Sequence, residues 1–340
     1  MLRLVSEIKI GNFQFDYVTN VNIKSSWDTF TDTASITLPN KFKDRNGKSI
    51  VVGANNIFQR GDEVEIKLGY FPNLVSKFKG FISKIIPDSP LILECEDRMW
   101  LLKQENIPSK TLTDTTIKKV IDFAVKTPFP DLVIEYDTPD AKIGSVEIDN
   151  KSFINVVKLF ELMKKRFGFN IYFLGDKLQV KAMNSIIALN NPIHRFGFQQ
   201  NIITSGLEYI REDDIQIVIK AESILRNDTR IILFGFKQNG KVVVTETPKT
   251  GEIRAMIVYN LTKSQLEEQI RRDIDRFIYE GYAGNFTTFL EPAVSHSDRV
   301  DLIDNKHVER EGRYLIRTTE TNFGINGGRQ IISLKNKISA

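Results

Sequence analysis

Short segments of alternating apolar and polar residues dominate the first hundred positions of the chain. In the segment 63–68, Val64, Ile66 and Leu68 alternate with charged residues, so one face of an extended strand is apolar and the other is polar. The same period of two occurs in the segments 7–10, 21–24, 34–38 and 91–96. Short strands separated by turn residues are typical of antiparallel sandwiches and barrels. We therefore expect a first β-barrel domain over residues 1–104.

Helical periodicity replaces this alternation in the next hundred residues. Residues 117–124 carry apolar side chains at helical spacing, and Thr113 or Asp114 can cap the helix. A second apolar stripe over 153–163 predicts another helix, and a hairpin with a Gly-Asp turn follows it. These elements predict a small α/β insert domain over residues 105–200.

Alternating strands return in the last part of the chain, where one clear helix interrupts them. The segment 264–280 is amphipathic, and its polar face mixes acidic and basic residues. A helix that binds a membrane surface usually has a basic polar face, so we expect this one to pack against a barrel. Residues 201–340 therefore predict a second β-barrel domain with one amphipathic helix. The predicted fold class is mainly β, with two antiparallel β-barrels and an α/β insert.

One strand motif occurs twice with the same internal spacing. Each copy has a polar turn, an alternating strand, a loop, and a returning strand that begins with an aromatic residue. Its positions are Gly61, Asp62, Val64, Ile66 and Phe78 in the first copy, and Asp298, Val300, Leu302 and Tyr314 in the second. We interpret the aspartates as turn residues that bond their own backbone, because Asp is common in that role. The duplication predicts a scaffold protein that contains one folding unit twice.

Composition limits the possible partners. The 340 residues include 47 basic and 43 acidic side chains, which gives a net charge of +4. This balance does not favour sequence-specific nucleic-acid binding or attraction to an anionic membrane. The chain has no apolar run of the roughly 20 residues that a membrane span needs, and its N-terminus lacks the apolar region of a signal peptide. We expect neither membrane insertion nor a signal peptide.

Candidate chemistry is sparse. His194, His296 and His307 lack metal-ligand spacing, so we interpret them as surface or capping residues. Cys95 lies in an alternating strand between two glutamates and is typical of a small buried side chain. We expect no catalytic site, no metal and no cofactor.

Two acidic clusters leave an enzymatic alternative open. The clusters are Glu94 with Glu96 and Asp97, and residues 212–214. Either could supply the acid and base of a glycan hydrolase, although such runs are more often solvated turns. A tail-associated enzyme that degrades cell walls or glycans is therefore the alternative. An adhesin-like carbohydrate binder would need exposed aromatic residues on loops, whereas most aromatic residues here fall at core positions.

In these motifs the chain resembles the baseplate hub proteins of phage tails, the late control D family, and the hub portion of type VI secretion spike proteins. The segment 58–82 is similar to the first barrel of that family. The order of segments from 266 to 338 is similar to its closing part. One difference is Ser297, which stands where the second copy often has glycine. No C-terminal spike or lysozyme segment is present, so we expect other chains to carry those functions.

The resemblance implies a homotrimer in which each subunit contributes two tube-like barrels, so that six similar barrels form a ring. Such a ring would join the hexameric tail tube to the threefold central spike. The implied partners are further copies of this chain, the tail tube protein, the central spike protein and other baseplate proteins. The implied location is the baseplate of a virion tail, assembled in the bacterial cytoplasm.

Overall fold

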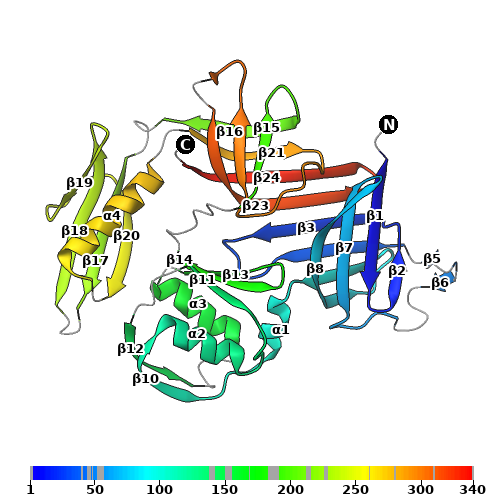
Figure 1. The fold of residues 1–340 in the computed structure, drawn as a ribbon, viewed down its shortest axis with the longest axis horizontal. Helices are drawn as coiled ribbons and strands as arrows, with labels where there is room; N and C mark the ends of the chain where they lie inside the picture. The colour runs from blue at the N-terminus through cyan, green and yellow to red at the C-terminus, as the bar shows by residue number, and fades with distance from the viewer. Residues whose placement is uncertain are drawn as a thin grey trace.

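The computed structural model describes residues 3–39, 41–43, 47, 49–51, 57–137, 142–149, 155–167, 169–182, 191–211, 216–225, 229–259, 261–278, 281–308 and 311–338. Within these ranges the fold is mainly β, and most strand pairs are antiparallel. One thirteen-stranded sheet spans the molecule, while four smaller sheets and four helices lie around it (Figure 1). The predicted fold class is confirmed at this level.

The N-terminal half of the large sheet follows the order β3-β4-β9-β8-β7-β1-β2. Its strands are β1 (Leu4–Ile10), β2 (Phe13–Phe15), β3 (Asn20–Ser26), β4 (Thr33–Leu38), β7 (Glu63–Tyr70), β8 (Asn73–Ile86) and β9 (Leu91–Glu96). A small hairpin of β5 (Lys41–Lys43) and β6 (Ser49–Val51) lies between β4 and β7. The inward-facing residues of these strands, among them Ile8, Ile36 and Ile66, are completely buried, as the alternating pattern predicts.

The C-terminal half of the sheet repeats this strand order. Its strands are β15 (Ile193–Gly197), β16 (Ile202–Ile210), β21 (Gly281–Thr288), β22 (Arg299–Ile303), β23 (Gly312–Gly324) and β24 (Gly327–Ile338). They pair in the order β16-β21-β24-β23-β22-β15, which matches β3-β4-β9-β8-β7-β1 strand for strand and in the same chain order. One pairing differs in direction, because β15 runs parallel to β22 whereas β1 runs antiparallel to β7.

The two halves join edge to edge through β3 and the second half of β23. The register places Asn22 opposite Asn322 and Ile23 opposite Thr321. Phe323 also packs into the apolar core of the first half. The predicted closure of each half into a barrel is not observed among the described strands, which form an open path from β16 to β2.

An α/β unit follows the first half of the sheet. Its elements are α1 (Met99–Gln104), β10 (Lys110–Thr116), α2 (Ile117–Lys126), β11 (Ile134–Asp137), β12 (Lys142–Ile148), α3 (Val156–Phe167), β13 (Phe169–Leu174) and β14 (Lys177–Ala182). The helices share one apolar core with the strands. The predicted caps of α2 are wrong: Thr113 and Asp114 lie within β10, and the side chain of Thr116 accepts the hydrogen bond from the Lys119 N–H.

A second insertion interrupts the C-terminal half between β16 and β21. It contains β17 (Ile217–Ile224), β18 (Arg230–Gln238), β19 (Lys241–Thr245), β20 (Glu252–Tyr259) and α4 (Lys263–Phe277). The four strands form their own sheet, and α4 lies across one face of it (Figure 1). The predicted helix is confirmed, but its expected packing against a barrel is wrong. Ile270 of α4 contacts Gly235 of β18 so closely that a Cβ there would lie 2.0 Å from its Cγ2.

Candidate assembly site

The repeated turns place equivalent residues in the same unusual backbone conformation. Gly61 has a φ of +94°, and Ser297 at the equivalent position has a φ of +71°. Glycine adopts this region without strain, whereas a residue with a Cβ does so at a cost. Because the second copy keeps the conformation without glycine, its surroundings must fix the turn.

Aspartate follows in both turns and makes the same hydrogen bond. The Gln59 N–H donates to Asp62 Oδ2 at 2.8 Å, and the Ser295 N–H donates to Asp298 Oδ2 at 2.9 Å. In each copy the carboxylate therefore holds the backbone three residues earlier. Asp298 carries an additional partner, His194, whose Nε2 lies 3.0 Å from Oδ2.

The returning strands, β8 and β23, are offset by two residues from the predicted alignment of the two copies. Ile66 lies opposite Phe78 in the first copy, whereas Val300 lies opposite Tyr314 in the second. The structural counterpart of Tyr314 is therefore Gly80, and the predicted equivalence of Phe78 and Tyr314 is wrong. Both aromatic side chains are buried, as are Val64, Ile66, Val300 and Leu302.

A β-bulge marks the same point in both copies. In the first copy the Ile82 N–H donates to the Asp62 carbonyl, and the β8–β9 register shifts directly after Ile82. In the second copy the Ile316 N–H donates to the Asp298 carbonyl, and the β23–β24 register shifts directly after Ile316. Bulges re-aim the strand that follows, so their recurrence indicates two copies of one folding unit.

Buried aromatic and polar side chains link the three parts of the molecule. Trp27 from the first half packs with Tyr172 of the α/β unit and Leu315 of the second half. The indole N–H of Trp27 donates to the Ile316 carbonyl at 3.0 Å. This cluster ties the α/β unit to the β3–β23 joint.

A chain of polar groups continues from this cluster. Tyr172 Oη lies 3.2 Å from Ser297 Oγ, which lies 3.3 Å from His296 Nδ1. His296 Nε2 lies 3.6 Å from Asp32 Oδ2. The residue types are those of a nucleophilic triad, but the exposure of Ser297 is 0% and that of His296 is 2%, so no substrate could reach them in this conformation. The interpretation of His296 as a surface or capping residue is wrong.

The first acidic cluster is engaged in local contacts. Glu96 forms an ion pair with Lys103 at 2.5 Å. Asp97 accepts hydrogen bonds from the backbone N–H groups of Asp32 and Met99, at 3.1 and 2.9 Å. Burial and the neighbouring Asp32 carboxylate raise the pKa of Asp97 well above its ordinary value. The second cluster, residues 212–214, lies outside the described residues.

The described residues contain no group of His, Cys, Asp and Glu that could hold a metal ion. Cys95 is buried, and burial raises the pKa of its thiol to about 12, which agrees with a packing role. None of the described helices is long and apolar enough to cross a membrane.

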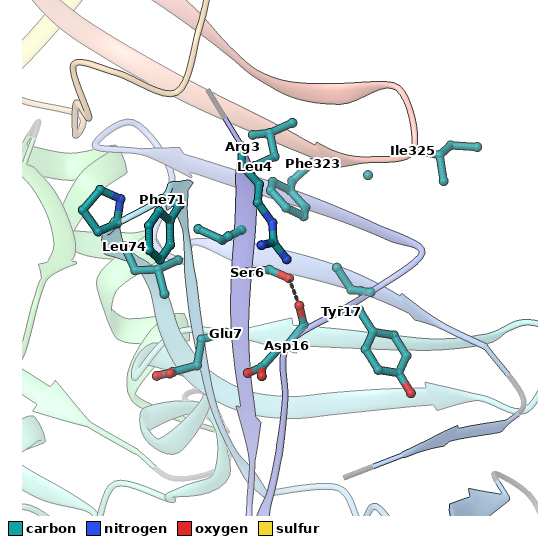
Figure 2. Close-up of a pocket in the computed structure, with 14 residues that line it drawn as sticks. Arg3, Leu4, Ser6, Glu7, Asp16, Tyr17, Phe71, Leu74, Phe323 and Ile325 are labelled. Carbon is teal, nitrogen blue, oxygen red and sulfur yellow. Dashed lines mark hydrogen bonds between the residues drawn. The ribbon is translucent and has the colours of Figure 1, made fainter. Parts of the chain in front are cut away.

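A groove of about 630 Å³ opens where the β7–β8 turn and the β23–β24 turn approach β1. Figure 2 shows Phe71 and Leu74 on one side of Ser6 and Tyr17 on the other. Phe71 is 67% exposed and Ile325 is 89% exposed. Ser6 donates to the carbonyl of Asp16. Exposed apolar side chains of this kind are typical of an interaction surface rather than of a catalytic centre.

Solved structures of tail proteins share this architecture. The tail protein of Neisseria meningitidis MC58 superposes with a TM-score of 0.63 and 13% identity, covering 98% of this chain and 96% of the other. The 43 kDa tail protein of prophage MuSo2 from Shewanella oneidensis gives 0.60 and 12%, covering 98% of both chains. An E. coli component of the type VI secretion system, itself structurally similar to the T4 tail proteins gp27 and gp5, gives 0.60 and 9%, covering 97% and 76%.

No family model and no curated protein sequence matches the chain. At these low identities the structural likeness establishes the fold. The chain has the fold of phage tail proteins and of a type VI secretion component that is itself similar to phage tail proteins, in agreement with the resemblance in its motifs.

Proposed function

We propose that this chain is a structural baseplate hub of a phage or phage-like tail. In this proposal three subunits form a pseudo-sixfold ring that joins the hexameric tail tube to the central spike. The observation that carries the proposal is the duplicated strand order, β3-β4-β9-β8-β7-β1 and β16-β21-β24-β23-β22-β15, within one chain. The full-length likeness to tail proteins supports it.

Symmetry explains why a duplicated unit suits this function. A ring with sixfold symmetry on one side and threefold symmetry on the other needs six similar surfaces from three subunits. One chain with two copies of the unit meets both requirements with closed interfaces. The proposed domains are the first copy (1–104), the insert (105–200) and the second copy with its inserted helix unit (201–340).

The second face of the large sheet has the polarity expected of a channel lining. Opposite the apolar core, β3 and β23 present side chains that are only partly buried. Asn22 Nδ2 lies 2.6 Å from Glu320 Oε1 and 2.7 Å from Asn322 Oδ1. An antiparallel sheet can expose a polar, hydrogen-bonded face of this kind to water while its other face packs on the core. In the hub we assign this face to the channel.

Molecular mass in solution tests the proposal. Light scattering at tens of micromolar protein should give three times the chain mass of 39.0 kDa. A protein that stays strictly monomeric at that concentration contradicts the hub function.

A peptidoglycan zymogram separates the structural hub from the enzymatic alternative. For the hub it should show no clearing, because structural contacts occupy the first acidic cluster. Clearing that is abolished by Glu96→Gln or Asp213→Asn would favour the tail-associated enzyme.

A further inference from the structure

The joint between β3 and β23 forms beside the repeated turn of the second copy. On one side of β23, residues 312–315 pair with β22, and Ile316 then bonds to the turn at Ser297 and Asp298. Beyond the turn, residues 318–324 of β23 pair antiparallel with β3. The turn thus ends one pairing and makes room for a strand from the other half of the molecule.

Among the described strands, none occupies the equivalent position in the first copy. Residues 63–66 of β7 pair with 78–81 of β8, and Ile82 bonds to the turn at Gly61 and Asp62. Beyond that turn, residues 84–86 pair with β9 and have no partner strand on the β7 side in the described part of the chain. Because β8 corresponds to β23 and β3 corresponds to β16, the strand expected at this position is β16.

β16 is an open edge that matches this vacancy. Within the described ranges it pairs with β21 alone. None of its residues is buried, whereas Val21, Ile23 and Ser26 of the equivalent β3 are. An edge strand of nine residues is a template for another strand, and natural proteins usually cover such an edge.

We propose that β16 of one subunit pairs antiparallel with residues 84–86 of β8 in the next subunit. This inference rests on the proposed trimeric hub and assigns the joint between its subunits. The observed pairing of Lys24 with Glu320 and of Ser26 with Thr318 fixes the register. Through the shared strand pairing, Lys24 and Ser26 of β3 correspond to Glu208 and Ile210 of β16. Thr318 and Glu320 of β23 correspond to Lys84 and Ile86 of β8. The same register therefore places Glu208 opposite Ile86 and Ile210 opposite Lys84.

Side-chain chemistry agrees with this register. Tyr209 comes opposite Ile85, which pairs two apolar side chains on the core side of the sheet. Lys84 and Glu208 become diagonal neighbours of opposite charge, an arrangement that stabilises antiparallel pairs. The joint between subunits is shorter than the joint within the chain, because Pro87 lacks an N–H and ends the pairing.

Paired cysteines test the register directly. In a Cys95→Ser background, Ile86→Cys with Glu208→Cys should form disulfides between chains on mild oxidation, seen as dimers and trimers on a non-reducing gel. Each single variant should give no cross-linked chains. The matched control is Lys24→Cys with Glu320→Cys, which occupies the observed joint and should form a disulfide within one chain.

The outcomes separate this inference from the proposed function. A trimeric mass with no disulfide at 86 and 208, while the control pair oxidises, overturns the inference and leaves the hub standing. A monomeric mass for the unmodified chain overturns both.

Charge reversal provides a second test that needs no oxidation. Lys84→Glu and Glu208→Lys should each weaken trimer association by roughly two- to fivefold, and the double reversal should restore it. Single reversals that leave association unchanged count against the joint.

Discussion

At the scale of single residues, the repeated turns depend on backbone conformation more than on side-chain identity. Gly61 and Ser297 share a positive φ, but the contacts that hold them differ. A Cβ on Gly61 would lie 3.2 Å from Trp100 Cη2. Ser297 is held by Tyr172 and His296. The first turn therefore needs glycine, whereas the second is fixed by its neighbours.

Gly61→Ala should lower the free energy of unfolding by more than backbone strain alone. A left-handed residue with a Cβ costs about 1–2 kcal/mol, and the Trp100 contact adds to this cost. The matched control is Gly175→Ala, which has a φ of +60° and no atom within 4 Å of the added Cβ. Urea denaturation should rank Gly61→Ala as the more damaging change. Equal losses in the two variants would contradict the role of Trp100.

Lys77 carries a buried ammonium group near the second turn. Its Nζ has no hydrogen-bond partner among the residues that the structure describes. Burial lowers its pKa from 10.5 to about 8, against the opposing effect of Asp298 and Glu291. Between these two pH values the unfolded chain binds more protons than the folded chain, so stability should rise with pH from 7 towards 10. A shift of this size corresponds to up to about 3 kcal/mol.

Lys77→Met should remove this rise and stabilise the protein at pH 7. Denaturation measured at several pH values checks the slope. Lys79→Met is the control, because the Lys79 side chain is exposed and the variant should keep the slope. A slope that persists in Lys77→Met would assign it to another group.

At the scale of elements, periodicity predicted most strands and the helix that begins after Thr262. Its capping box with Gln265 is visible in the sequence because such caps are local. The surface that this helix covers was not predictable, since an apolar stripe does not specify which sheet it faces.

The two-residue error at Phe78 and Tyr314 has a similar cause. A shift by two keeps every side chain on the same face of a strand, so the alternating pattern cannot detect it.

The β3–β23 joint could not be read from the sequence for a further reason. It pairs residues near opposite ends of the chain, and no local pattern specifies a partner at that separation. The buried chain from Tyr172 to Asp32 is likewise built from three distant segments, each of them unremarkable alone.

The unit of β17–β20 with α4 should be removable. Ile210 and Gly281 are paired across β16 and β21, so a short Asn-Gly hairpin loop can connect them in place of the intervening residues. The equivalent strands β3 and β4 are joined by a short loop over residues 27–32. The shortened chain should stay folded and keep its oligomeric mass, as measured by circular dichroism and light scattering.

Replacement of residues 27–32 by the same Asn-Gly loop is the control. It removes Trp27 and Asp32 from the buried cluster and should destabilise the protein strongly. If the shortened chain lacking the α4 unit unfolds as readily as this control, the insertion is part of the core scaffold.

At the scale of the whole molecule, the chain is two copies of a six-stranded unit fused edge to edge, with two insertions. The fusion already provides one of the joints that a ring of such units requires. Three subunits joined by three further contacts of the same kind would close the ring. The inserted units would then recur three times, so the ring would be sixfold near its sheets and threefold at its periphery.

Electron micrographs of the purified assembly test this account most directly. Class averages viewed along the ring axis should show threefold symmetry, with six similar lobes around a central channel. A particle with twofold symmetry, or a ring of three lobes whose halves do not resemble each other, would contradict the assembly derived from the duplicated sheet.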